Sequence, residues 1–291
     1  MKPAPFEYHR PETALEAVEL LAELGDDAKV LAGGQSLVPM LNLRLAVFGH
    51  LVDIGRIDEL HGIERLTDGL RIGAGTTEAA VERSAEVADA VPLLARATPF
   101  IGHFQIRNRG TVGGTLAHAD PAAEYPAVAL TLDAELEALS PRGTRSIPAA
   151  EFFTGLWETA LAPDELLTAV TFPVWSGRCG CAVEELARRH GDFALAGATV
   201  ALELDADDRV RRCAIGLLGL GSTPVRATAA EASATGADVR RLDAEQLGRL
   251  AVADLDAVPS DLHGSAEFRS HVGGVMVARA WASATEEALS G

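Results

Sequence analysis

The sequence is poor in cysteine, in aromatic residues and in basic residues. Its three cysteines, Cys179, Cys181 and Cys213, are too few and odd in number for a disulfide framework, which favours a reducing, cytoplasmic location. Only 5% of the 291 residues are aromatic, so the hydrophobic cores must depend on Ala, Val, Leu and Ile. The chain has 25 Lys and Arg but 42 Asp and Glu, so its formal charge is −17. Because such a charge is repelled by the phosphate backbone, nucleic acid is not expected as a partner.

Long apolar runs are also absent. No segment approaches the roughly 18 consecutive apolar residues that a transmembrane helix needs, so we expect no membrane span. The first nine residues lack the apolar core of a secretory signal, so none is expected. Hydrophobic residues make up 48% of the chain and charged residues 23%, which is typical of a folded globular protein. The length suits two or three modest domains.

The pattern of elements divides the chain into three regions, which we expect to be domains spanning 1–60, 61–175 and 176–291. Helix and strand alternate in the first region, which predicts a small parallel α/β unit. Thr13 and Glu16 have the spacing of a capping box, and Gly25 is suited to end the helix that they begin. The elements expected after it are a strand over 29–32, a short helix over 37–44 and a strand over 51–54.

The second region predicts a mainly antiparallel α+β domain. Its expected strands are 70–75, 134–139 and 166–172, with helices near 78–84 and 93–98. In the third region, two strands flank the turn residues 205–208, and a carboxy-terminal helix within 265–289 is expected to pack on their small sheet. The small, polar stretch 227–236 is interpreted as a loop or a loose helix end.

A first glycine-rich segment, Ala32-Gly33-Gly34-Gln35-Ser36-Leu37, follows a predicted strand. A phosphate approaches the backbone closely only where no Cβ intrudes, and glycine also adopts the conformations that turn successive N–H groups inward. Gln35 and Ser36 add side-chain donors. The segment is neither Gly-x-Gly-x-x-Gly nor a P-loop, and it is not a nucleophile elbow. It is therefore either a pyrophosphate cradle or a plain strand-to-helix turn.

A second glycine-rich segment, Thr111-Val112-Gly113-Gly114-Thr115, again places paired glycines between hydroxyl residues. Asp120 and Glu124 follow it and are suited to accept hydrogen bonds from ribose hydroxyls. Two such loops in one chain favour a large ligand with a diphosphate in its middle, and a dinucleotide is the natural candidate.

The two segments together, with Ile106-Arg107-Asn108-Arg109-Gly110 before the second and Ala119-Asp120-Pro121-Ala122-Ala123-Glu124 after it, resemble the FAD-binding subunits of molybdenum hydroxylases, of the xanthine dehydrogenase and carbon monoxide dehydrogenase type. The resemblance covers essentially the whole chain, including Phe6-Glu7-Tyr8, Val52-Asp53-Ile54 and Arg188-Arg189-His190-Gly191-Asp192-Phe193-Ala194. It implies an α+β fold: a two-subdomain FAD-binding fold of the vanillyl-alcohol-oxidase type, formed by 1–60 and 61–175, followed by a C-terminal α+β domain with a small antiparallel sheet.

The same resemblance implies FAD as the cofactor and an oxidoreductase function. Electrons would pass from 2Fe-2S clusters of a small subunit, through FAD, to an external acceptor. A large subunit with molybdopterin would perform the hydroxylation, and a dimer of such three-subunit units is expected. This chain would then carry no catalytic residue and no metal. The residues implied to bind the cofactor are Ala32, Gly33, Gly34, Gln35, Ser36 and Leu37 around the pyrophosphate, Thr111, Gly114, Thr115 and Ala117 on its other side, Asp120 and Glu124 at sugar or ribityl hydroxyls, and Ile101 and Leu167 at the rings.

The sequence departs from the family at one place. Family members often carry Tyr-Glu-Lys where this chain has Val183-Glu184-Glu185, with the basic residue near the flavin. Since a cation there would favour negative charge on the flavin, its replacement by Glu185 is expected to shift the redox potential.

Several other residues admit two interpretations. Cys179-Gly180-Cys181 lacks the further ligands that a metal site needs, and Arg107 and Arg109 either contact phosphate or form salt bridges that shape the loop. His118 either packs near the cofactor or contacts it. Two alternative functions are a stand-alone FAD oxidoreductase, for which the sequence offers no base or substrate pocket, and a flavin-free scaffold, which would leave the glycine segments without a purpose. The substrate and the final electron acceptor are not specified by the sequence.

Overall fold

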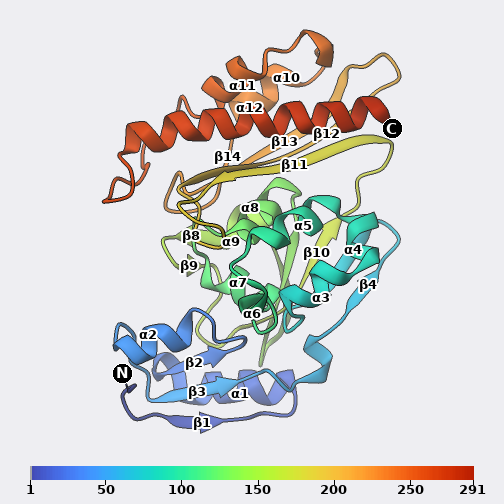
Figure 1. Ribbon diagram of the computed structural model, residues 1–291. Helices are drawn as coiled ribbons and strands as arrows, with labels where there is room; N and C mark the ends of the chain where they lie inside the picture. The colour runs from blue at the N-terminus through green and yellow to red at the C-terminus, as the bar shows by residue number, and fades with distance from the viewer. Residues whose placement is uncertain (1) are drawn as a thin grey trace.

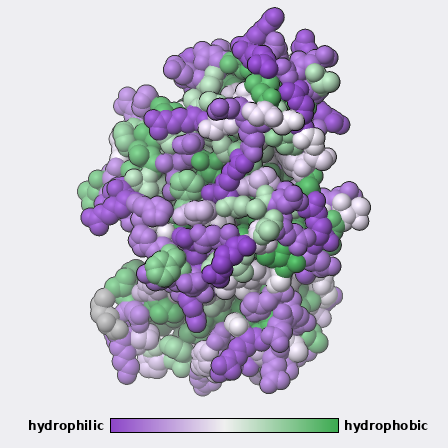
Figure 2. Space-filling model, turned by 45° about the vertical axis from the view of Figure 1, so that its right-hand side comes forward, coloured by the Kyte–Doolittle hydropathy of each residue, from purple (hydrophilic) through white to green (hydrophobic). Residues whose placement is uncertain are grey.

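The computed structural model describes residues 2–291 and contains three main β-sheets, which lie one above another along the long axis of the molecule (Figure 1). The amino-terminal sheet lies at one end, the largest sheet is in the middle and the carboxy-terminal helix crosses the other end. Polar residues cover most of the face seen in Figure 2, and hydrophobic residues appear there in small groups. Among residues 2–291, no helix is both long and apolar enough to span a bilayer.

The amino-terminal sheet is parallel, with the strand order β1-β3-β2. The Thr13 hydroxyl caps α1 by accepting a hydrogen bond from Glu16 N at 3.1 Å, and Gly25 ends the helix with φ +59°. The predicted parallel α/β unit is therefore confirmed, although β1 was not predicted. Its elements are β1 (Glu7–His9), α1 (Ala14–Leu24), the 3-10 turn η1 (Gly25–Asp27), β2 (Ala28–Leu31), α2 (Leu37–Leu43), β3 (His50–Asp53) and η2 (Asp58–Leu60).

The middle sheet is antiparallel and five-stranded, in the order β4-β5-β10-β6-β7, as the second region predicted. Short helices pack against it around a core that contains Tyr125, Phe152 and Phe172, all with no exposed surface. The strands are β4 (Ile63–Arg65), β5 (Gly69–Gly73), β6 (Glu135–Ser140), β7 (Gly143–Pro148), β10 (Leu166–Pro173) and the separate pair β8 (Phe153–Gly155) and β9 (Glu158–Thr159). The helices are α3 (Glu78–Arg83), α4 (Ala85–Ala90), α5 (Pro92–Ala97), η3 (Thr98–Phe100), α6 (Phe104–Arg107), α7 (Val112–His118), α8 (Glu124–Thr131) and α9 (Ala149–Phe152).

The carboxy-terminal sheet is antiparallel, with the order β11-β12-β13-β14, and the long helix α12 lies across it (Figure 1). A Cβ on Gly180 would lie 1.9 Å from Ala284 O, so the glycine between the two cysteines lets α12 pack directly on β11. The elements are β11 (Arg178–Leu186), β12 (Ala196–Leu204), β13 (Val210–Leu218), β14 (Val225–Arg226), α10 (Thr228–Ala234), η4 (Val239–Arg241), α11 (Ala244–Ala251) and α12 (Ala266–Ser290).

One expectation for secondary structure was wrong and another was left open. The stretch 227–236, interpreted as a loop or a loose helix end, is largely helix α10, and its Ala230 and Ala234 pack into the carboxy-terminal core. The second glycine-rich segment was expected to be a loop, and instead Val112–His118 forms helix α7. In α7, burial of Val112 and Gly113 overrides the low helix propensity of the paired glycines.

Candidate functional site

The first glycine-rich segment connects β2 to α2 and keeps its backbone donors free. Gly34 has φ +74°, and the Gln35 side chain donates to Gly33 O at 3.0 Å, which fixes the turn. The N–H groups of residues 33–36 find no acceptor anywhere in the described chain. Four consecutive free donors, with a helix beginning at Leu37, are suited to bind an anion.

In the second glycine-rich segment, the backbone N–H groups of residues 112–115 all donate to protein oxygens. Val112 N donates to Thr76 O at 2.9 Å and Gly113 N to Ala74 O at 2.8 Å. Thr111 is the N-cap of α7, because its hydroxyl accepts from Gly114 N at 3.0 Å and its carbonyl accepts from Thr115 N at 3.0 Å. This segment therefore supplies a rigid wall rather than free N–H groups.

The two segments lie against each other. A Cβ on Gly33 would be 2.2 Å from Arg109 O and 2.9 Å from the Cα of Gly110. A Cβ on Gly114 would be 3.6 Å from that of Ala32. The contact therefore requires glycine at position 33, and it brings the open loop and the start of α7 to one place, as a shared diphosphate site demands.

Glu78 lies behind this contact and was not identified from the sequence. Its carboxylate is 2% exposed and accepts from the Thr115 hydroxyl at 2.8 Å, while its Oε2 has no partner among residues 2–291. Gly110 leaves room for it, because a Cβ there would lie 2.4 Å from Oε2. Burial raises the pKa of Glu78 to about 7. Nothing in the local sequence distinguishes Glu78 from an ordinary helix-start glutamate.

Two predicted residues, Asp120 and Glu124, follow α7. Glu124 begins α8 and is 5% exposed, and burial, then the nearby charges of Glu185, Glu78 and Asp120, raise its pKa to about 8. Asp120 accepts from Ala122 N at 2.9 Å and from the Trp157 indole at 3.3 Å.

His118 and Trp157 form an aromatic pair at the same place. Their rings stack with centroids 6.4 Å apart, and burial lowers the pKa of His118. Trp157 is 55% exposed and has φ +58°, an unusual conformation for a bulky residue. Ala117 lies on the exposed side of α7. Trp157 therefore places an exposed indole beside Asp120.

Of the two interpretations of Arg107, the structure supports the salt bridge that shapes the loop. Its guanidinium forms two hydrogen bonds with Glu82, both at 2.9 Å, and a third with Ile101 O at 3.0 Å. It therefore shapes the loop that holds Ile101 half-buried, whereas the exposed Arg109 offers only its carbonyl to the contact with Gly33. Leu167, expected at the rings, is 4% exposed within the core of the middle sheet.

Glu185 lies in β11, beside the buried carboxylates. Its Oε2 is buried without a partner in the described chain, and burial raises its pKa to about 7. Among the charged neighbours of Glu124, Glu185 contributes most to the raised pKa of Glu124. Glu185 thus joins Glu78, Asp120 and Glu124 in one group of acidic side chains.

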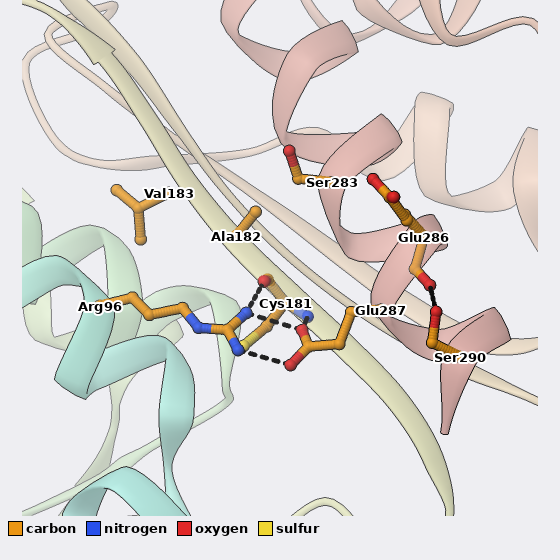
Figure 3. A pocket seen from close by; sticks show the side chains of 8 residues that line it. All are labelled: Arg96, Cys181, Ala182, Val183, Ser283, Glu286, Glu287 and Ser290. Atoms are coloured by element: carbon orange, nitrogen blue, oxygen red, sulfur yellow. Dashed lines mark hydrogen bonds and ion pairs between the residues drawn. The ribbon is translucent and has the colours of Figure 1, made fainter.

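A separate cavity of about 550 Å³ lies between α5, β11 and α12 and contains none of the predicted site residues (Figure 3). Arg96 crosses it and pairs with Glu287, with 2.5 Å between Nη2 and Oε1, and it also donates to Cys181 O. Burial raises the pKa of the Cys181 thiol to about 12, so it stays protonated at neutral pH and is unsuited to bind a metal. The contact is structural, because it joins the middle region to the last helix.

Comparison with known families identifies the family to which this chain belongs. Residues 4–175 match the family described as the FAD binding domain in molybdopterin dehydrogenase, and residues 181–284 match the CO dehydrogenase flavoprotein C-terminal domain. The chain belongs to the FAD-binding subunits of the molybdopterin dehydrogenases. FAD is its cofactor, it is a subunit of an oxidoreductase, and the α+β fold expected from the resemblance is confirmed.

The relatives of this flavin subunit align over nearly its whole length. It is 42% identical to the 6-hydroxypseudooxynicotine dehydrogenase complex subunit alpha of Paenarthrobacter nicotinovorans, over 99% of this chain and 97% of the relative. It is 38% identical to the carbon monoxide dehydrogenase medium chain of Hydrogenophaga pseudoflava, over 96% and 97%. A solved structure of carbon monoxide dehydrogenase from the same organism superposes with a TM-score of 0.95 at 39% identity, covering 99% of both chains.

Proposed function

We propose that this flavin subunit transfers electrons from 2Fe-2S clusters of a small partner subunit to an external acceptor, within a complex that also contains a large molybdopterin subunit. The observation that supports it is the row of free N–H groups at residues 33–36, set against the start of α7. When bound, FAD supplies the exchange of one or two electrons. The dimer of heterotrimers, and a cytoplasmic location that suits three free cysteines, belong to the same proposal.

The residues of the chain would hold the cofactor in two ways. Backbone N–H groups of Gly33 to Ser36 would neutralise the diphosphate, and α7 would limit its position from the other side. The proposed binding set is the one predicted from the sequence: Ala32, Gly33, Gly34, Gln35, Ser36, Leu37, Ile101, Thr111, Gly114, Thr115, Ala117, Asp120, Glu124 and Leu167. Of these, Leu167 has the least exposed side chain to offer to a ligand, because it lies in the sheet core.

The division into domains at 1–60, 61–175 and 176–291 is part of the proposal. Separate hydrophobic cores support it, since the clusters around Val52, Phe172 and Trp281 each belong mainly to one of the three ranges. The first two ranges would hold the cofactor between them, as the contact of Gly33 with Arg109 suggests.

The test uses the full complex. The chain is co-expressed with its large and small partner subunits, and carbon monoxide and N-heterocycles are screened because complexes of related chains are named for carbon monoxide and nicotine derivatives. After rapid mixing, we expect cluster reduction first and flavin bleaching second. In a flavin-depleted complex, the clusters should still be reduced while the acceptor is not. Reduction of the acceptor at an unchanged rate without flavin would reject the proposed role.

A further inference from the structure

Three potential metal ligands, Glu7, His9 and His50, lie together on two adjacent parallel strands, β1 and β3. Glu7 and His9 are two residues apart in β1, so their side chains share one face of the sheet. His50 begins β3 and is the direct neighbour of Glu7 in the parallel register. One ligand atom from each of the three residues lies within 4.8 Å of the others.

The distances within the cluster suit a bound ion. His9 Nε2 and His50 Nδ1 are 3.0 Å apart, and Glu7 Oε2 is 3.7 Å from His50 Nδ1. An ion bound at about 2.0–2.2 Å by imidazole and carboxylate holds its ligand atoms roughly 3.3 Å apart in tetrahedral geometry. Both contacts lie within a few tenths of an ångström of that spacing. The rings already direct nitrogen atoms at each other, with centroids 5.2 Å apart.

We propose that Glu7, His9 and His50 form a binding site for a divalent transition-metal ion, with Zn²⁺ as the representative ion. Two imidazole nitrogens and one carboxylate oxygen are a ligand set of the kind that binds Zn²⁺, and water completes the fourth position. The side chain of Glu7 is 76% exposed and that of His50 is 22% exposed, so an ion enters from solvent without opening the fold. The net charge of −17 raises the local concentration of cations.

The position of this site separates it from the flavin site. The cluster lies on β1 and at the first residue of β3, whereas the free N–H groups of residues 33–36 follow the carboxyl end of the parallel strand β2. A metal there joins the three-residue strand β1, at the edge of its sheet, to the central strand β3. The ion therefore stabilises the amino-terminal strand and takes no part in electron transfer.

The experiment measures Zn²⁺ binding to the full flavin-loaded chain without a histidine tag, by competition with a chromogenic chelator. We expect one bound equivalent for the unaltered protein and a rise in the melting temperature when Zn²⁺ is added. His9→Ala and His50→Ala should each weaken binding about tenfold or more, and His271→Ala, which removes an exposed histidine of α12, should leave it unchanged.

Glu7→Gln provides a second variant that does not depend on folding, since the side chain is mostly exposed. It should lower the affinity severalfold while flavin content and circular dichroism stay constant. A Co²⁺-loaded sample should show visible bands of four-coordinate geometry that His50→Ala removes. The proposal is wrong if the tag-free protein binds no Zn²⁺, or if these three variants bind it as tightly as His271→Ala.

Discussion

The two glycine-rich segments are alike in sequence and opposite in how they use their backbone. Residues 33–36 leave every N–H group without a protein acceptor, whereas each N–H of residues 112–115 donates to a protein oxygen. The first segment is thus suited to bind an anion, and the second is a packed helix start that supports it. Paired glycines serve ligand approach in one place and close packing in the other, and the sequence motif alone does not separate these roles.

Substitution of Gly33 by alanine tests the open segment and should have the largest effect. The added Cβ would lie 2.2 Å from Arg109 O, a backbone atom that cannot rotate away, so the loop and α7 must separate. Overpacking of about 1–3 kcal/mol at the site converts to roughly a five- to 150-fold loss of FAD affinity. The ratio of flavin to protein absorbance and a fluorescence titration of the flavin-free chain measure this loss.

The matched control is Gly55→Ala, where a Cβ would meet only the Asp53 side chain, at 3.1 Å. It should retain its flavin. If Gly33→Ala also purifies with a full complement of FAD, the assignment of the open segment as the diphosphate cradle is wrong.

Substitution of Gly113 by alanine tests the packed segment. Its Cβ would lie 2.3 Å from that of the buried Ala74, so we expect the free energy of unfolding to fall by about 1–3 kcal/mol. Urea denaturation of the flavin-free chain measures this change. The folded fraction should bind FAD more tightly than Gly33→Ala does. A variant with normal stability and no flavin would reverse the contrast between the two segments.

Elements whose ends or faces depend on neighbouring residues in the sequence were predicted correctly. Thr13 and Gly25 marked the ends of α1, alternating apolar residues predicted the strand that became β6, and the stretch 166–172 predicted β10. The strand β11 was not predicted, because the side of it that is buried packs against α12, which lies about a hundred residues later in the sequence. Tertiary packing, which no single window of sequence contains, decides such elements.

The candidate site likewise contains residues that the sequence revealed and residues that it did not. The glycines of both segments were visible in the sequence because their spacing is distinctive. Glu78 was not visible, because its importance comes from burial against Gly110 and a hydrogen bond from Thr115, both distant in sequence. The sequence also did not show which backbone N–H groups are free. Those of Val112 and Gly113 are not free, because Thr76 and Ala74 supply acceptors for them.

The packed segment is followed by buried carboxylates, and their titration offers a third test. Burial raises the pKa of Glu124 to about 8, above the value in an unfolded chain. The folded state therefore keeps this proton while the unfolded state loses it, and the free energy of unfolding declines as pH rises from about 5 to 8, by at most about 1.4 kcal/mol per pH unit for one proton. Glu78 and Glu185, both with pKa about 7, add to the decline in the lower part of this window.

Urea denaturation at several pH values, on the flavin-free chain, measures this dependence. Glu124→Gln should flatten the slope between pH 5 and 8. Glu137→Gln is the control with the opposite sign. Burial alone would raise the pKa of Glu137, but hydrogen bonds from Thr168 and Arg71, with the charge of Arg71, outweigh it and lower the pKa, so the stability that Glu137 contributes is lost only as pH falls below about 4.5. An identical slope for Glu124→Gln and the unaltered chain would show that Glu124 is ionised in the folded protein.

The smallest expected effect concerns the cap of α7. Thr111→Val keeps the shape of the side chain and removes the hydroxyl that accepts from Gly114 N, at a cost of about 1 kcal/mol in the free energy of unfolding. Ser265→Ala removes the equivalent cap of α12, in which the Ser265 hydroxyl accepts from Phe268 N at 3.1 Å, and should cost a similar amount.

The two caps differ in position, because only the cap of α7 lies at the contact between the two segments, where Gly114 faces Ala32. Only Thr111→Val should therefore alter the visible spectrum and affinity of the bound flavin. If Ser265→Ala changes both to the same degree, the effect comes from global stability and the cap of α7 has no special relation to the cofactor.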